Sequence, residues 1–593
     1  MYILGISCFY HDAAAALLKD GVLVAAAEEE RFSRKKHDFG FPSAAIQFCL
    51  EQAGITSRDL DYAVFYERPF VKFDRILMTT LGTFPRSWRV FRESMVAWFK
   101  DKLWIKRLIQ SHLELPATKV LFVDHHASHA ASAFFCAPFK DAAVLTFDAV
   151  GEWATATIGR GEALWNGEGR NDLRLFHEMR FPHSLGLLYS AFTAFLGFEV
   201  NEGEYKVMGM APYGEPRYLD KIHKLLRVNN DGSFWMDMSY FCYHHSTDRM
   251  YNSRFERLFG TPRDPSTDFV TSLTDPNVDA SAAAIRQNQY YADLAASIQR
   301  VTEDLILKMA HEAYRRTGSK NLCLAGGVAL NSVANGRLIQ ETPFEHLYVQ
   351  PAAGDSGGAL GAALYVYHVL LGQPRQFTMA HAYWGKAYGA ERIREVLERS
   401  GLRYQEYDHD DRLLDMVTED LMAGKVVGWY QGRFEWGPRA LGNRSILADP
   451  RRADMKGIVN QKIKFREPFR PFAPAILEER ATDYFTVDAA HQYPARFMLL
   501  VLPIRGEKAE LIPAVNHMGT GRLQTVRQEW NPRYHGILER FGDATGVPVV
   551  LNTSFNLRGE PIVTEPAHAL STFLRSGLDV LVMEGFRVEK DAS

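Results

Sequence analysis

The chain has 593 residues, of which 47% are hydrophobic, 23% charged and 12% aromatic, and its formal net charge at pH 7 is -3. A length above about 250–300 residues predicts more than one domain. The near-neutral balance argues against the basic surface of a general nucleic-acid binder, so no nucleic-acid partner is expected.

Cysteine usage and apolar patterning indicate the compartment. The N-terminal "MYILGISCFYHD" lacks a basic leader, and no apolar run approaches the roughly 20 residues of a spanning helix. We therefore expect a cytoplasmic protein without a transmembrane segment. An odd number of cysteines without metal-ligand or redox-motif spacing agrees with a reducing compartment; they are Cys8, Cys49, Cys136, Cys242 and Cys323.

Two stretches near the start of the chain resemble each other. Residues 3–17, "ILGISCFYHDAAAAL", and 144–158, "VLTFDAVGEWATATI", align without gaps. Each shows an apolar strand, a polar turn and a second strand of small residues, which predicts a β-hairpin. The echo indicates an internal duplication, and a cleft between two such halves is a natural ligand site.

Residues 72–107 form a basic aromatic segment that contains Trp88, Trp98 and Trp104. Its pattern predicts one or two amphipathic helices. The segment is either an insertion packed on the first domain or a wall that binds an acceptor, including an anionic or lipid-linked one.

Three histidines occur within five positions of "LFVDHHASHAASAFF", which predicts a strand end that enters a helix. His125 and His129 would share a helix face at i and i+4, and His126 and His129 at i and i+3, so spacing alone does not choose a metal-binding pair. The alternative is a polar helix start with structural histidines. Asp148 and Asp355 are the candidate carboxylate ligands. The alternative is that each stabilises a turn or caps a helix N-terminus, roles in which Asp is common.

Two glycine turns follow, at "NLCLAGGVALNSVANGRL" and "VQPAAGDSGGALGAALYVYHVL". Each predicts a strand or loop, a turn and a helix, and the amides at such a helix start can hold an anion. Each turn alone is equally typical of a tight connection. The linker-like "GQPRQFTM" then places a domain boundary at about residue 375.

The second domain is predicted to contain an amphipathic helix, "DRLLDMVTEDLMAG", and two buried strands, "GKVVGWYQG" and "VPVVLNTSFN". Between them, residues 431–474 interleave glycine turns, prolines and aromatics with many cations, which favours a pocket for a small multiply charged anion over a solvated basic face. These cations are Arg433, Arg439, Arg444, Lys464, Arg466 and Arg470, and Arg522, Asn552, Thr553, Ser554 and Asn556 follow downstream.

These motifs together resemble the O-carbamoyltransferase family, which decorates nodulation factors and antibiotics. The resemblance rests on "GISCFYHDAAAAL", "AAAEEERFSRKKHDFGFP", "HHASHAASAFF", "NEGEYKVMGMAPYG", "AGGVALNS", "GDSGGALGAAL", "GPRALGNRSIL", "KFREPFRPFAP" and "LNTSFN", in that order from about residue 1 to 590. It implies an α/β protein of two domains. Residues 1–374 would form an actin-like ATPase fold, a duplicated ribonuclease-H-like domain similar to the tRNA threonylcarbamoyl transferase subunit, and residues 375–593 a YrdC-like α/β domain that forms an adenylate.

The resemblance also implies roles for individual residues. The metal ligands would be His125, His129, Asp148 and Asp355, which favours His125 over His126. Carbamoyl phosphate and ATP would be held by Arg439, Lys464, Arg470, Arg522, Asn552 and Ser554. His11 and Asp12 would lie beside the acceptor, with His11 taking its proton, and Lys206, Gly327 and Asn331 would face a nucleotide in the first domain.

The implied activity is an ATP-dependent O-carbamoyltransferase. It would convert carbamoyl phosphate and ATP to carbamoyl-adenylate and pass the carbamoyl group to a hydroxyl of a sugar, antibiotic or glycolipid. ATP and a divalent metal, iron or alternatively Mg, Mn or Zn, would be the cofactors. The alternatives are an actin-fold small-molecule kinase, a threonylcarbamoyl-type tRNA modification enzyme and a non-catalytic nucleotide-binding regulator. The acceptor, the metal and the oligomeric state, including a homodimer, stay open.

Overall fold

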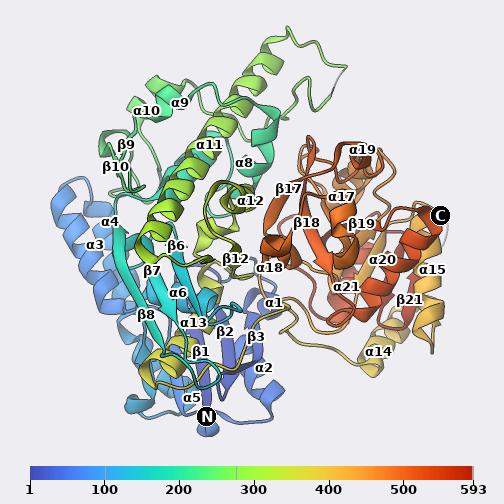
Figure 1. The fold of residues 1–593 in the computed structure, drawn as a ribbon, viewed down its shortest axis with the longest axis horizontal. Coiled ribbons are helices and arrows are strands. Elements are labelled where there is room, and N and C mark those ends of the chain that lie inside the picture. The colour runs from blue at the N-terminus through green and yellow to red at the C-terminus, as the bar shows by residue number, and fades with distance from the viewer. Residues whose placement is uncertain (101, 276, 591–593) are drawn as a thin grey trace. The chain divides into compact units, whose positions relative to one another are not determined.

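The computed structural model describes residues 1–100, 102–275 and 277–590, and the chain divides into two compact units (Figure 1). Unit 1 comprises Met1–Val24 and Cys49–Thr378, and unit 2 comprises Ala25–Phe48 and Met379–Ser593. The chain passes into unit 2 after Thr378, close to the boundary expected from the linker. Residues 25–48, which the sequence assigned to the first domain, group with the second unit.

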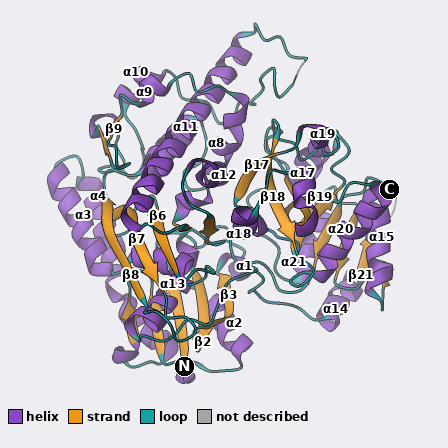
Figure 2. Cartoon of the chain, in the orientation of Figure 1, coloured by secondary structure: helices purple, strands orange, loops and turns teal. Residues whose placement is uncertain are grey.

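Unit 1 contains two five-stranded sheets with one topology (Figure 2). The orders β3-β2-β1-β4-β5 and β8-β7-β6-β11-β12 correspond strand for strand, with an antiparallel hairpin followed by two parallel neighbours in each sheet. This repeat confirms the duplicated ribonuclease-H-like fold and the two hairpins that the sequence echo predicted. The strands are β1 Tyr2–Ser7, β2 Ala14–Lys19, β3 Val22–Glu28, β4 Tyr62–Phe65, β5 Val120–Phe122, β6 Asp141–Phe147, β7 Ala154–Glu162, β8 Asp172–Arg180, β11 Asn321–Ala325 and β12 His346–Val349. Strand β3 spans the change of unit, because its residues from Ala25 on group with unit 2.

The helices of unit 1 include two that consist largely of small residues, α6 and α13. Among the described residues, no helix is long and apolar enough to cross a membrane. The main helices are α3 Pro69–Thr83, α4 Trp88–Lys100, α5 Ile105–Leu113, α6 His125–Phe134, α7 Leu185–Phe195, α8 Glu204–Met210, α10 Ser253–Phe259, α11 Ala283–Thr317, α12 Ser332–Glu341 and α13 Asp355–Tyr365; β9 Leu226–Val228 and β10 Phe234–Met236 form a separate hairpin.

Helix α13 packs with its backbone against both α6 and β1. A Cβ atom added at Gly361 would lie 1.8 Å from the Ser128 carbonyl oxygen, and one added at Gly5 would lie 1.8 Å from the Ala359 carbonyl oxygen. Only glycine permits this approach, because any side chain would overlap a main-chain atom that cannot move alone. The close contact places Asp355, the first residue of α13, beside the histidines of α6.

We expect Gly361→Ala to lower the free energy of unfolding by about 1–3 kcal/mol, the usual cost of overpacking a core. The added methyl group would also separate α13 from α6 and weaken metal binding by the histidine–aspartate cluster. Chemical denaturation and calorimetric metal titration measure the two effects. Gly82→Ala is the matched control, because its Cβ meets no atom within 4 Å. Equal behaviour of the two variants would contradict the prediction.

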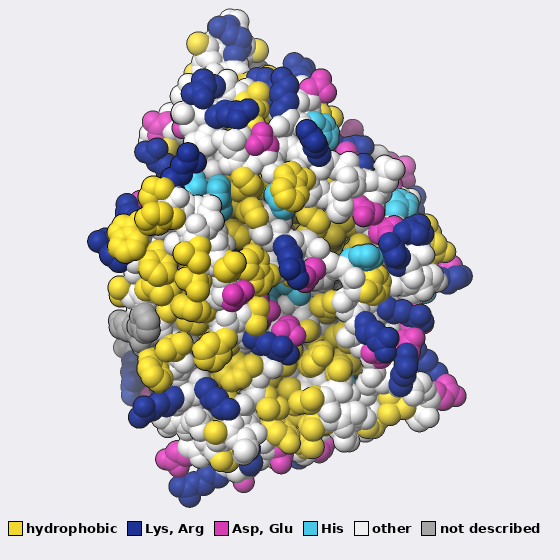
Figure 3. All heavy atoms as spheres, turned by 90° about the vertical axis from the view of Figure 1, so that its left-hand side faces the viewer, with side chains coloured by type: hydrophobic (Ala, Val, Ile, Leu, Met, Phe, Trp, Pro, Cys, Tyr) yellow, Lys and Arg dark blue, Asp and Glu magenta, His cyan; other side chains and the backbone are white. Residues whose placement is uncertain are grey.

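The basic aromatic segment forms helices, as expected, but α3 is oriented opposite to an ordinary amphipathic surface helix. It buries Lys72 and Arg75 and exposes Phe70, Met78 and Leu81. Hydrophobic side chains gather on the face of the molecule that corresponds to the left-hand side of Figure 1, where α3 and α4 lie (Figure 3). The cations of α3 therefore face the protein interior.

Unit 2 is built on a mixed nine-stranded sheet, in the order β13-β21-β20-β14-β15-β19-β16-β18-β17. Helices α15 and α20 cover an apolar core around Trp429, with Leu413 and Ile537 among its members. The expected helix and buried strands correspond to α15, β14 and β19. The strands are β13 Tyr404–Glu406, β14 Val427–Tyr430, β15 Arg444–Ala448, β16 Ala473–Leu477, β17 Leu500–Pro503, β18 Thr520–Val526, β19 Val549–Ser554, β20 Val580–Met583 and β21 Phe586–Glu589; the helices include α1 Glu30–Ser33, α14 Ala390–Ser400, α15 Asp410–Met422, α18 Gln492–Arg496, α20 Pro532–Thr545 and α21 Pro566–Leu574, and α2 Ser43–Ala53 spans the change of unit.

Candidate metal centre and anion pocket

Four side chains of unit 1 converge in a buried histidine–aspartate cluster. The Nε2 atoms of His125 and His129 lie 3.1 Å apart, and Asp148 Oδ2 lies 2.9 Å from His125 Nε2. Asp355 Oδ1 lies 3.7 Å from His125 Nε2 and 3.6 Å from His129 Nε2. One donor atom from each residue lies within 4.8 Å of the others. The structure thus brings together all four candidate ligands; their binding of a metal stays a prediction.

His126 points away from this cluster. Its Nδ1 lies 2.6 Å from the Thr146 hydroxyl and its Nε2 lies 2.9 Å from the Ala154 carbonyl oxygen, to which it can donate. Burial, followed by the neighbouring rings of His125 and His129, lowers the pKa of His126 to about 3. His126 is therefore a neutral, hydrogen-bonded core residue, and the geometry selects His125 as the partner of His129.

Polar residues around the cluster hold its members in place. The Tyr66 hydroxyl donates to Asp355 Oδ2 at 3.2 Å, and Glu152 Oε2 accepts from the backbone amide of His125 at 3.2 Å. Glu67 Oε2 lies 4.0 Å from His125 Nδ1. Such outer partners orient ligands and tune their affinity. The sequence reasoning missed them, although Tyr66 and Glu67 directly follow the buried strand β4.

The donor set fits a divalent cation. Burial acts to lower the pKa of His129, but Asp148 and Asp355 outweigh it and raise that pKa to about 9. Burial likewise opposes ionisation of Asp148, yet hydrogen bonds from His125 and His129 hold its pKa well below its usual range. The Nε2 atoms of His125 and His129 lie 3.1 Å apart and face two carboxylates, so the cluster favours binding of a positive charge. Imidazole and carboxylate together accept several divalent metals, so the set does not specify one.

His11 and Asp12 occupy the turn between β1 and β2. His11 Nδ1 donates to Asp12 Oδ2 at 2.7 Å. Burial acts to lower the pKa of His11, but Asp12, with smaller contributions from Asp355 and Asp148, raises it to about 9. An imidazolium cannot accept a proton, so a base role for His11 requires the ring to be neutral when the acceptor binds.

The three candidate nucleotide residues of unit 1 lie in different settings. A Cβ atom added at Gly327 would lie 3.4 Å from Asp148 Oδ1, so this glycine turn adjoins the cluster. Asn331 caps α12 by accepting from the Ala334 amide at 3.1 Å, and its side chain bonds Gln299. Lys206 lies on α8 with its ammonium 5.5 Å from the centre of the Phe198 ring. Only Gly327 is placed beside the cluster by these contacts.

Lys464 anchors the candidate anion pocket of unit 2. Its buried ammonium donates to the carbonyl and hydroxyl oxygens of Ser554 at 2.6 and 3.2 Å, and to the carbonyl and side-chain oxygens of Asn556 at 2.9 and 2.7 Å. Burial, followed by the charges of Arg466 and Arg470, holds the pKa of Lys464 well below its usual range. An incoming anion would offset this crowding of cations.

Three of the other candidate anion-binding residues, Arg522, Asn552 and Ser554, share one face of the unit 2 sheet. Asn552 Nδ2 donates to Gln524 Oε1 at 2.6 Å and to the Ala440 carbonyl oxygen at 3.2 Å. Because alternate residues of a strand face the same side, Arg522 lies on the face of Gln524, and Ser554 on that of Asn552. Arg439 directly precedes Ala440 in the chain. Arg522, Asn552 and Ser554 therefore lie on one face of the sheet, Lys464 bonds Ser554, and Arg470 lies close enough to Lys464 to lower its pKa.

A clamp on the loop before Arg439 was not foreseen. Glu28 Oε1 accepts from the Gly437 amide at 2.8 Å, and Arg31 Nη2 donates to the Gly437 carbonyl oxygen at 2.7 Å. Gly437 has φ of 104°, which favours glycine. Both clamp residues are buried and come from "EEERF", a charge-dense motif whose role the sequence alone did not reveal. They hold the main chain that presents Arg439.

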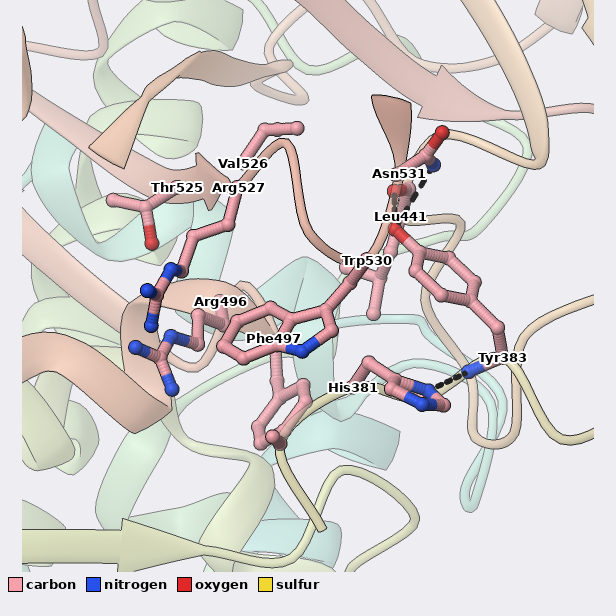
Figure 4. A pocket seen from close by; sticks show the side chains of 12 residues that line it. His381, Tyr383, Leu441, Arg496, Phe497, Thr525, Val526, Arg527, Trp530 and Asn531 are labelled. Carbon is pink, nitrogen blue, oxygen red and sulfur yellow. Dashed lines mark hydrogen bonds between the residues drawn. The ribbon is translucent and has the colours of Figure 1, made fainter. Parts of the chain in front are cut away.

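A small hollow of about 20 Å³ lies elsewhere in unit 2 (Figure 4). The guanidinium carbons of Arg496 and Arg527 lie 4.4 and 4.7 Å from the centre of the Trp530 ring, and Arg496 is paired with Glu478 at 2.9 Å. This volume holds about one water molecule. The hollow is therefore a structural feature rather than a nucleotide site.

The chain thus joins a duplicated α/β unit that holds a buried histidine–aspartate cluster to a second α/β unit that carries the candidate anion-binding residues. The carbamoyltransferase N-terminus model matches residues 2–364 and the carbamoyltransferase C-terminus model matches residues 418–590. The chain therefore belongs to the carbamoyltransferase family, and it is an enzyme of that type.

Several relatives agree with this assignment. An uncharacterized protein of Synechocystis sp. is 47% identical over 100% of this chain and 97% of its own length. The nodulation protein NolNO of Sinorhizobium fredii is 36% identical over 98% of this chain and 79% of its own length. The 3'-hydroxymethylcephem-O-carbamoyltransferase of Amycolatopsis lactamdurans is 34% identical over 41% of this chain and 44% of its own length.

Proposed function

We propose that the protein is an ATP-dependent O-carbamoyltransferase with two half-reactions. Unit 2 hydrolyses carbamoyl phosphate with one water molecule to carbamate and phosphate. A carbamate oxygen then attacks the α-phosphorus of ATP, which forms carbamoyl-adenylate and releases pyrophosphate. Unit 1 transfers the carbamoyl group to a hydroxyl of a small-molecule acceptor, and AMP leaves. The observation that carries the proposal is the presence, in one chain, of a buried donor cluster and a separate group of cations around the buried Lys464.

Activation in unit 2 requires charge neutralisation. Carbamoyl phosphate and ATP together carry several negative charges that oppose attack on the α-phosphorus. Fixed guanidinium and ammonium groups stabilise this charge without reorganising during the reaction. Lys464, held by four oxygen atoms, is fixed in this manner. The carbamoyl-adenylate is labile in water, so the pocket must also exclude solvent.

Transfer in unit 1 takes place at the histidine–aspartate cluster. His125, His129, Asp148 and Asp355 would hold a divalent ion, which would supply Lewis-acid polarisation of a carbonyl or phosphate oxygen. His11, oriented by Asp12 at 2.7 Å, takes the proton of the acceptor hydroxyl. Asp12 thereby fixes which ring nitrogen of His11 stays protonated and which faces the acceptor.

The activation step is tested without an acceptor. We expect purified protein to release pyrophosphate from ATP only when carbamoyl phosphate is added, and Lys464→Met to abolish this release by removing the central ammonium. Pyrophosphate is followed by a coupled assay, and AMP and ADP by chromatography. Lys462→Met is the control, since Lys462 is exposed on the same helical turn. ADP formation alone, or release without carbamoyl phosphate, would contradict the proposal.

A further inference from the structure

Arg75 is a buried cation on the inner face of α3. Its exposed fraction is 8%, and its Nε atom is buried without a hydrogen-bond partner. Among the residues that the structure describes, no ion pair or hydrogen bond engages its guanidinium group, whose recorded contact is the Phe181 ring at 5.0 Å. A buried guanidinium normally has a carboxylate or several carbonyl partners, because desolvation of an unpaired charge is costly.

The nearby carboxylates are already engaged. Glu67 Oε2 accepts from the Lys72 ammonium at 2.7 Å. Glu152 accepts from the backbone amides of Arg68 and His125 at 2.5 and 3.2 Å. Both acids interact electrostatically with Arg75 without bonding to it. Since Lys72 has Glu67 as its partner, Arg75 is the cation of α3 to which the described part of the chain gives no ion-pair or hydrogen-bond partner.

The surroundings of Arg75 belong to the transfer site. Glu67 lies 4.0 Å from His125 Nδ1, and Glu152 bonds the His125 amide. Tyr10 interacts electrostatically with Arg75 as well as with Asp148 and Asp355 of the cluster. Tyr10 also precedes His11, the residue that takes the acceptor proton in the proposed mechanism. Arg75 thus lies within electrostatic reach of Glu67, Glu152 and Tyr10, and the first two of these contact His125 of the cluster.

We propose that Arg75 binds an oxyanion of a substrate, a phosphate or a carboxylate, at the transfer site. The planar guanidinium matches the oxygen pair of either group. The inference rests on the proposed function, because it assigns this anion to one of two substrates of the transfer step. Its source is either the phosphate of the carbamoyl-adenylate or an anionic group carried by the acceptor.

The test locates an oxyanion directly. Crystals of the full chain are soaked in tungstate, whose anomalous scattering marks its position. We expect a tungstate peak at hydrogen-bond distance from the Arg75 guanidinium in the wild type and none at that position in Arg75→Met. Tungstate in the unit 2 pocket serves as the positive control for the soak. A peak in unit 2 with none at Arg75 would overturn the proposal.

A soak with both AMP and tungstate identifies the source. If the AMP phosphate occupies Arg75, the oxyanion is that of the donor. If AMP binds elsewhere and tungstate remains at Arg75, the oxyanion is that of the acceptor. Wild-type pyrophosphate release reports on the proposed function separately, so failure of one inference is distinguished from failure of the other.

A thermal-stability comparison tests the alternative that Arg75 serves only to pack on Phe181. If Arg75 is kept for a ligand, Arg75→Met should melt at the same or a higher temperature than the wild type, because it removes an unpaired buried charge. Arg75→Lys should retain tungstate binding at least tenfold more weakly, since it keeps the charge and loses the planar fork. A marked loss of stability in Arg75→Met, without a tungstate peak in the wild type, would establish a packing role instead.

Discussion

Replacing His129 with alanine should abolish divalent-metal binding by the cluster and carbamoyl transfer with it. His129 Nε2 faces His125 Nε2 and both carboxylates, so its removal takes away one of four convergent donors. Loss of an outer partner alone typically costs about 10–100-fold in metal affinity or activity, and we expect a larger loss for a ligand. Metal content and calorimetric titration measure affinity, and transfer of labelled carbamoyl groups measures activity.

His126→Gln provides the matched control on the same helix. His126 is equally buried, but it bonds Thr146 and Ala154 rather than the cluster. We expect this variant to lose stability and to keep its metal stoichiometry. Pyrophosphate release should persist in His129→Ala, because unit 2 catalyses that step. Retention of metal by His129→Ala, or its loss from His126→Gln alone, would contradict the assignment of ligands.

Arg31→Ala should strongly impair the activation half-reaction although Arg31 lies far from Arg439 in the sequence. The substitution removes the donor to the Gly437 carbonyl oxygen and leaves Glu28 buried without its cation. Breaking a buried pair by removing one partner costs about 3–5 kcal/mol. The loop that presents Arg439 would lose one side of its clamp. Denaturation of the full chain and pyrophosphate release measure the two consequences.

A double variant separates stability from positioning. Glu28→Gln with Arg31→Met removes both charges, and replacing a buried pair together is often nearly neutral for stability. We expect the free energy of unfolding to recover while the Michaelis constant for carbamoyl phosphate or ATP stays raised, because the loop is still unclamped. Full recovery of activity along with stability would show that the pair acts on folding alone.

The duplicated fold could be predicted because its signal is local. The two hairpins repeat a pattern within about fifteen residues, and each half closes its own sheet. The choice between His125 and His126 could not be made from spacing, because both pair with His129 on a helix. It depends on Thr146 and Ala154, which the fold brings to His126 from the second hairpin.

The Glu28–Arg31 clamp and the orientation of α3 could not be predicted from the sequence, because both depend on residues far apart in the chain or on which helix face is buried. Phe32 packs against Phe434 with ring centres 6.0 Å apart, and this long-range contact brings the clamp to Gly437. A helix pattern likewise reveals that α3 has two faces and not which of them is buried. The buried carboxylate of Glu67 pairs with Lys72 and keeps the cationic face of α3 toward the interior. Glu67 lies just after strand β4, which precedes α3 in the chain.

The assignment of residues 25–48 to unit 2 affects how the protein can be divided. The chain enters unit 2, leaves it, and enters it again after Thr378. A protease cut at that last crossing would yield an N-terminal fragment that still carries Arg31 and Arg34, which bonds the carbonyl oxygens of Pro561 and Ile562. The two fragments should therefore copurify. A gene fragment that begins at residue 379 should give an unstable product, because it lacks part of its own core.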